Sequence, residues 1–149
     1  MSLRPHAVGR VASRLALAAV FVSGGRHVWR HPDGPAQAAG PLLQRLRAST
    51  PLLDRVTDRQ LVRLNAAVHV AAGAGLATGR ASGVCATALV GSLVPTTLAA
   101  FPFWKQPEGP GRAKQKGEFL KNVALAGGLL ATATLAAGDR PHRGPRQRP

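Results

Sequence analysis

Four stretches of this chain contain no charged residue, and they cover residues 15–25, 64–79, 81–104 and 122–138. All 26 formal charges lie outside them. A helix needs roughly 20 mainly apolar residues to cross about 30 Å of hydrocarbon. The third stretch is long enough by itself, and the others become so when a flanking Arg or Lys extends its side chain to the interface. The pattern predicts four spans near residues 10–29, 61–79, 82–103 and 119–138.

The charge-free stretches have two alternatives to membrane spans. The first stretch also fits a secretory signal peptide, because three Arg residues precede it and Ser23-Gly24-Gly25 follows. No clear A-x-A cleavage pattern is present, and Trp29 continues the segment as an interfacial anchor, which favours a span. The other stretches could be buried helices of a soluble bundle. A soluble helix normally carries a charged face, however, and residues 81–101 have none. The expected fold class is all-α.

The segments between the stretches predict the remaining organisation. His-Pro-Asp-Gly-Pro at residues 31–35 ends the first helix. A stripe of Leu42, Leu43 and Leu46 beside two Arg residues predicts a short helix on the membrane surface. Thr57 and Gln60 have the spacing of a capping box and should start the second span. We expect residues 105–118 to form a loop and residues 139–149 a basic disordered tail. The result is one domain, residues 1–138, with an up-down four-helix bundle.

Composition and charge limit the possible functions. The chain has 149 residues and a formal net charge of +14, which suggests nucleic-acid binding, but its charges are not interleaved with aromatic residues. Of the Lys and Arg residues, 12 lie at the end where the first and third spans finish and 8 at the other. This distribution favours a cytoplasmic location for the first end, in contact with anionic headgroups. One Cys excludes an internal disulfide, and the His spacing predicts no metal site. No catalytic motif is present.

Polar residues inside the spans define the candidate site. Asn65 and His69 are one helical turn apart, and Thr96 and Thr97 follow Pro95. His69 lies about 12 Å from the start of its span, and Thr97 about 10 Å from the same membrane face, at 1.5 Å per residue. We therefore expect one polar pocket, opening to that face beside further polar and aromatic residues, with these members: Asn65, His69, Thr96, Thr97, Trp104, Lys121 and Asn122. A simple interhelical hydrogen bond without a cavity is the alternative.

Five short motifs, taken in order, resemble the DoxX family of small four-helix bacterial membrane proteins. They are Ser23-Gly24-Gly25, Asn65-Ala-Ala-Val68, Ser92-Leu-Val-Pro-Thr-Thr-Leu98, Pro102-Phe-Trp104 and Phe119-Leu-Lys-Asn122. The chain departs from the family pattern at Phe101, where the family has His, and at His69, where Gln is common. The resemblance implies an integral protein of the plasma membrane, in some members a subunit of a quinone-linked redox assembly. A structural or interaction protein of the cell envelope is the alternative function, and neither requires an enzyme acting alone.

Overall fold

The computed structural model describes residues 5–138, and these are almost entirely helical. Five α-helices and two short 3-10 segments follow one another: α1 (Pro5–Arg30), α2 (Asp33–Ser49), η1 (Pro51–Arg55), α3 (Asp58–Thr78), α4 (Ser82–Ala100), η2 (Phe103–Lys105) and α5 (Pro110–Gly138). Helices α1, α3, α4 and α5 are each long and apolar enough to cross a membrane. The all-α prediction is therefore confirmed, whereas the predicted tail lies outside the described residues.

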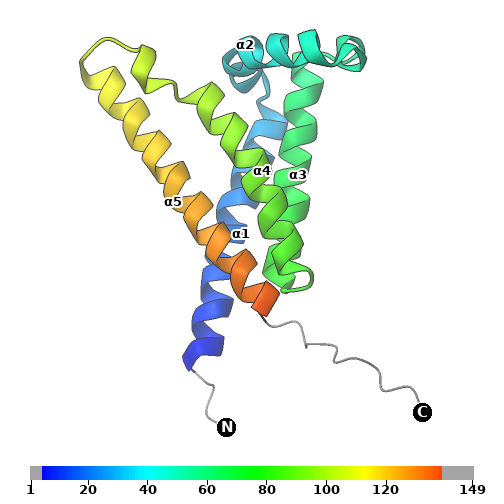
Figure 1. Cartoon of the computed structure of the whole chain (residues 1–149), viewed down its shortest axis with the longest axis vertical. Coiled ribbons are helices and arrows are strands. Elements are labelled where there is room, and N and C mark those ends of the chain that lie inside the picture. The colour runs from blue at the N-terminus through cyan, green and yellow to red at the C-terminus, as the bar shows by residue number, and fades with distance from the viewer. Residues whose placement is uncertain (1–4, 139–149) are drawn as a thin grey trace.

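The long helices are arranged as two pairs. Helices α1 and α3 run side by side, and α4 and α5 cross them obliquely (Figure 1). Helix α2 lies across one end of this arrangement, next to the start of α3. We call this end, which also holds the connection between α4 and α5, the α2 end. The turn between α3 and α4 lies at the opposite end (Figure 1).

Local sequence explains where α3 begins and ends. The predicted capping box is present, because the Thr57 hydroxyl accepts from the Gln60 amide and the Gln60 side chain accepts from the Thr57 amide. At the other end of α3, Gly79 has a φ of 73°, a left-handed conformation that glycine adopts without strain. Ala81 also has a positive φ, of 52°, so two residues complete the reversal into α4.

The predicted loop over residues 105–118 is wrong in its second half. Helix α5 begins at Pro110, nine residues before the expected start of the fourth span. Proline suits the first position of a helix because its φ is already helical and its missing N–H would have no partner there. The Ala113 amide donates to the Gly109 carbonyl and closes the first turn. Good helix formers then continue the helix through Lys114 and Lys116 into the apolar part.

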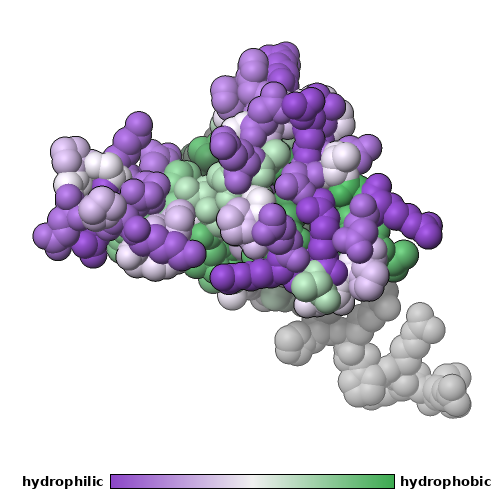
Figure 2. All heavy atoms as spheres, turned by 90° about the horizontal axis from the view of Figure 1, so that it is seen from above, coloured by the Kyte–Doolittle hydropathy of each residue, from purple (hydrophilic) through white to green (hydrophobic). Residues whose placement is uncertain are grey.

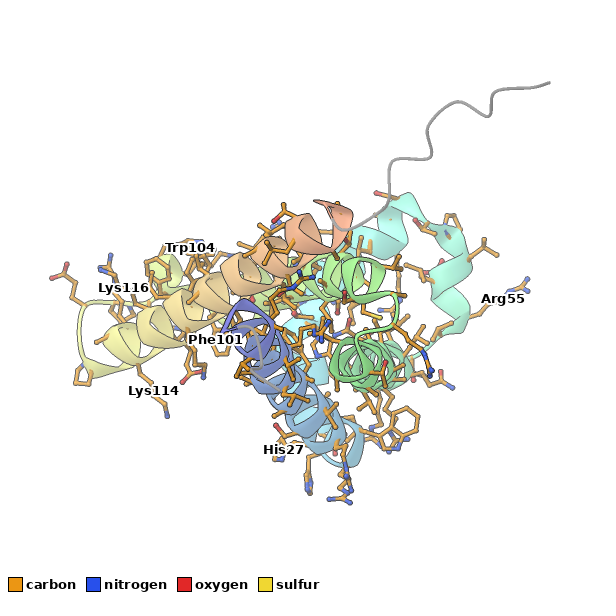
Figure 3. All side chains as sticks on the ribbon, turned by 90° about the horizontal axis from the view of Figure 1, so that it is seen from below. His27, Arg55, Phe101, Trp104, Lys114 and Lys116 are labelled. Atoms are coloured by element: carbon orange, nitrogen blue, oxygen red, sulfur yellow. The ribbon has the colours of Figure 1, made fainter. Side chains whose placement is uncertain are left out.

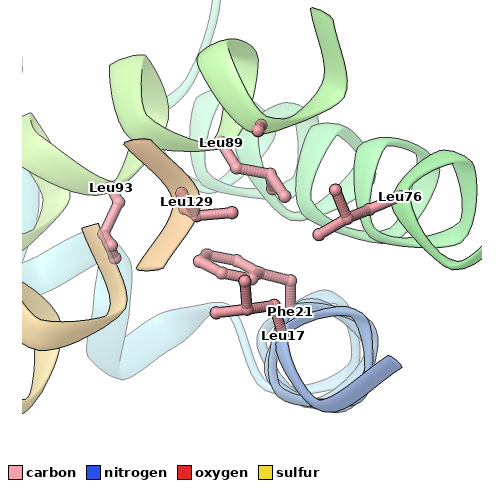
Figure 4. Packing of buried hydrophobic residues seen from close by; sticks show 7 residues of the cluster. Leu17, Phe21, Leu76, Leu89, Leu93 and Leu129 are labelled. Atoms are coloured by element: carbon pink, nitrogen blue, oxygen red, sulfur yellow. The ribbon is translucent and has the colours of Figure 1, made fainter. Parts of the chain in front are cut away.

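Each long helix contributes to a single apolar core. The cluster includes Leu17 and Phe21 from α1, Leu76 from α3, Leu89 and Leu93 from α4, and Leu129 from α5 (Figure 4). Leu76, Leu89 and Leu129 have no solvent-exposed surface. Burial of such a side chain contributes about 1.5–3 kcal/mol in water. Within a bilayer the same contacts act through close packing instead.

Glycine allows α1 and α3 to approach each other closely. A Cβ on Gly25 would lie 2.8 Å from the Ala66 carbonyl oxygen, and one on Gly73 would lie 3.0 Å from a Val22 methyl group. Real Cβ atoms do not approach a backbone oxygen so closely, which means that the backbones touch at Gly25. Small residues have this role between membrane helices.

The outer surface of the long helices is strongly apolar. Leu64 and Val84 each expose 63% of their surface, and many other large apolar side chains face outward. Seen from the α2 end, hydrophilic residues gather over α2 and over the α4–α5 connection, with apolar surface between them (Figure 2). An apolar exterior with polar ends is what a lipid environment requires.

Candidate functional site

Asn65, His69 and Ser92 form a hydrogen-bonded cluster between α3 and α4. The Ser92 hydroxyl donates to Asn65 Oδ1 at 2.5 Å, and His69 Nε2 lies 2.8 Å from the same Ser92 oxygen. The ring of Phe21 from α1 meets the imidazole edge to face, with 5.3 Å between centroids. Three helices therefore position His69. We call Asn65, His69 and Ser92 the polar cluster.

The direction of these bonds fixes the proton on the imidazole. Asn65 Oδ1 can only accept, so the single hydroxyl proton of Ser92 is committed to it. His69 Nε2 must then carry a proton and donate to Ser92. An imidazole that donates to a serine cannot take the proton from that serine, as a general base of a nucleophilic serine would. The polar cluster joins two helices and does not activate Ser92.

The predicted threonines lie outside this cluster. The Thr96 hydroxyl donates to the carbonyls of Ser92 and Leu93 within its own helix, at 2.9 Å each. The Thr97 hydroxyl accepts from Asn122 Nδ2 of α5 at 3.0 Å. Thr97 is buried, so the hydrogen bond between Thr97 and Asn122 joins α4 to α5 inside the protein. The hydrogen bonds thus divide the predicted pocket residues between two helix interfaces.

Trp104 and Lys121 form a third group at the α4–α5 connection. Trp104 packs with Phe103 and Phe119, with ring centroids 5.2 Å and 5.9 Å away. Lys121 pairs with Glu118, one turn earlier in α5. Figure 3 places Trp104 beside this connection, near Lys114 and Lys116 and far from Arg55. The structure therefore brings Asn65 and His69 together, pairs Thr97 with Asn122, and leaves Trp104 and Lys121 in a separate aromatic and charged group.

Ser92 is the site residue that sequence reasoning missed. A signal for it was available, because residues 69 and 92 lie 11 and 12 positions from Arg80 in the turn between α3 and α4. Two antiparallel helices with equal rise bring residues at equal distance from their turn to equal depth. Counting inward from the turn pairs His69 with Ser92. Counting from the outer helix ends, which are less certain, points to Thr97 instead.

A sizeable groove lies elsewhere, and the described residues form no evident metal centre. The groove has a volume of about 390 Å³ and lies between α1 and α3, with none of the predicted site residues in its lining. Within residues 5–138, no group of three or more His, Cys, Asp or Glu side chains could hold a metal ion.

Comparison of the chain with known protein families, with curated proteins and with solved structures finds no match.

Proposed function

We propose that this is a multi-pass protein of a bacterial plasma membrane with the architecture of the DoxX family. In this proposal α1, α3, α4 and α5 form a four-helix bundle across the bilayer. The apolar outer surfaces of these helices support it, since lipid covers such surfaces without penalty. Helix α2 would lie on the membrane surface. Exposed Leu46 of α2 and Leu52 of the adjoining η1 support this placement, because they can reach the acyl boundary.

We propose further that the chain is an interaction protein of the envelope and carries out no reaction alone. The observation that carries this proposal is the chain of hydrogen bonds from His69 through Ser92 to Asn65, which joins α3 to α4. A polar group in hydrocarbon must find a partner, and these residues find one on the adjacent helix. The hydrogen bonds of these polar residues hold α3 against α4.

Anionic lipid is the proposed partner at the α2 end. That end carries 12 Lys and Arg residues and five Asp and Glu residues. Each basic residue near an anionic leaflet contributes about 1 kcal/mol of attraction. Arg55, Lys114 and Lys116 point away from the helices on different sides (Figure 3). The charge is thus spread around the rim of this end, where headgroups would surround a cytoplasmic surface.

A quinone-linked redox subunit is the second candidate, and one observation favours it. Within the described residues, neither Asn65 Nδ2 nor His69 Nδ1 has a hydrogen-bond partner. An amide N–H can donate to a quinone carbonyl, and an imidazole nitrogen can accept from a quinol hydroxyl. These two free groups give the polar cluster the chemistry of a quinone contact.

Titration calorimetry with a short-chain ubiquinone distinguishes the two candidates. The interaction protein is expected to give no saturable signal. Saturable binding that His69→Leu abolishes and His27→Leu retains would establish the redox candidate instead. His27 is an exposed residue of α1, and circular dichroism would verify that both variants fold.

Membrane placement and lipid preference are tested separately. After a carbonate wash the protein should stay in the membrane pellet, and recovery in the supernatant would refute the membrane proposal. Lipid that copurifies in mild detergent should contain a larger anionic fraction than the membrane it came from. Equal fractions would refute an anionic partner.

A further inference from the structure

The groove between α1 and α3 combines a basic edge with an apolar floor. Arg26, Trp29 and Arg30 of α1 line it on one side. Small apolar residues of α3 line the other side, namely Ala67, Val70 and Ala71. We call this site the α1–α3 groove. Its volume of about 390 Å³ is within the range of roughly 300–1,000 Å³ typical of small-molecule sites.

The two arginines of the groove have no acidic partner in the described part of the chain. Arg26 and Arg30 are one turn apart, so their guanidinium groups extend from the same face of α1. Some of the other bases at the α2 end are paired, for example Arg47 with Asp58 and Arg59 with Asp33, at 2.6 Å each. No Asp or Glu lines the groove. These two adjacent positive charges can therefore bind an anion from outside the chain.

The packing of α1 on α3 places Arg26 deeper than Arg63. Its neighbour Gly25 lies against Ala66 and Val70. Arg63, the last charged residue of α3 before its apolar stretch, lies three to seven residues nearer the α2 end. Arg26 lies one residue nearer the α2 end than Gly25, so at 1.5 Å per residue it starts about 3–9 Å further into the bilayer than Arg63. An unpaired charge at such depth is unfavourable, so a bound counter-ion is strongly favoured.

We propose that the α1–α3 groove binds one anionic phospholipid. Its phosphate would lie between the Arg26 and Arg30 guanidinium groups, which match phosphate oxygens in charge and geometry. One acyl chain would pack on Ala67, Val70 and Ala71. The indole of Trp29, which is 51% exposed, would lie at the level of the glycerol, where amphipathic rings are preferred. This inference rests on the membrane placement proposed above.

The combination of a basic edge and an apolar floor favours a lipid over a free anion in the α1–α3 groove. Inorganic phosphate would satisfy the arginines but would leave the apolar floor uncovered. A neutral lipid would cover the floor but leave two unpaired positive charges. A molecule with an anionic head and an apolar chain satisfies both halves.

The test is native mass spectrometry of the full chain in mild detergent, titrated with phosphatidylglycerol and with phosphatidylcholine. The groove variant Arg26→Gln/Arg30→Gln removes both guanidinium groups. Arg45→Gln/Arg55→Gln is the control, because it removes the same charge from two exposed residues of the α2 end. A third variant, Ala71→Trp, fills the floor and keeps both arginines. All four residues that lose charge are exposed, so the fold should persist.

Wild type should bind the first phosphatidylglycerol at least about tenfold more tightly than the groove variant, because two charge-assisted contacts are lost. The control should stay within about twofold of wild type, and Ala71→Trp should bind more weakly. Equal losses in the groove variant and the control would overturn the groove, while a general anionic preference would stand. Displacement by millimolar inorganic phosphate, or no effect of Ala71→Trp, would also overturn it. If wild type prefers neither lipid, the proposed anionic partner fails as well.

Discussion

Substitution of Ser92 by Ala should loosen the contact between α3 and α4. The Ser92 hydroxyl makes two interhelical bonds, to Asn65 at 2.5 Å and to His69 at 2.8 Å. Alanine makes neither, and its smaller side chain brings no new contact. The change therefore leaves an amide oxygen and an imidazole N–H unpaired between two helices that otherwise meet through apolar groups.

The magnitude depends on the surroundings of these groups. In water-soluble proteins, an unsatisfied buried polar group costs about 1–3 kcal/mol. Interhelical bonds in membrane proteins average only about 0.6 kcal/mol, because the unfolded state within the membrane also finds partners. Two bonds of that size give a loss of about 1.2 kcal/mol. We take the membrane value, since α3 and α4 are both long and apolar enough to span.

Equilibrium unfolding in mixed micelles, followed by circular dichroism, measures this loss. A double-mutant cycle of Ser92→Ala with Asn65→Ala isolates the bond between these two residues. The control is Thr87→Ala, because the exposed Thr87 hydroxyl bonds only to the Gly83 carbonyl of its own helix. The control should change the free energy of unfolding by less than about 0.5 kcal/mol.

The cycle gives a clear criterion for rejecting the reasoning. Distant residues are additive within about 0.3–0.5 kcal/mol. A coupling energy below that range would mean that Ser92 and Asn65 do not interact, and the polar cluster would be refuted. A loss in Thr87→Ala equal to that in Ser92→Ala would mean that helix propensity, not the interhelical bond, sets the effect.

Three further predictions concern helix packing and helix ends. Gly25→Ala should lower the free energy of unfolding by about 1–3 kcal/mol through overpacking against the Ala66 carbonyl, whereas Gly127→Ala, with nothing within 4 Å, should leave thermal stability in detergent unchanged or raise it. Thr57→Ala should remove the capping box and cost about 1 kcal/mol in the same unfolding assay, and no loss would contradict the cap. Arg47→Met should speed trypsin cleavage between α2 and α3, because Arg47 bonds two carbonyls and one carboxylate there; an unchanged rate would refute this role.

The helices could be predicted from the sequence because their signals are local. Absence of charge over residues 64–79 and 81–104 sets the positions of α3 and α4. The capping box at Thr57 requires two residues three positions apart, and the structure contains both of its bonds. Helix α5 shows the weakness of the same reasoning. The glycine and proline residues at positions 107–111 are typical of a loop, although a proline at the first helical position starts a helix as readily as it ends one.

The site was harder to predict because it depends on the register between helices. Asn65 and His69 share a face of α3 by their spacing alone, and the structure keeps them together. Their partner depends on how far α4 is shifted along α3. The depth of Thr97, counted from the outer end of the third span, includes the error in where α4 ends, which is Ala100 and not residue 103. Depth counted from Arg80, in the turn between α3 and α4, avoids that error.

The same dependence on register explains why the α1–α3 groove could not be found in the sequence. Arg26 marks the end of an uncharged stretch, and taken alone it belongs at the membrane interface. Its depth becomes visible only when Gly25 is placed against Ala66 and Val70 of another helix. That contact depends on the absence of one methyl group, which no hydropathy pattern records. A bulkier residue at position 25 would separate α1 from α3 and change the α1–α3 groove. The close packing of these helices and the proposed lipid site thus depend on the same glycine.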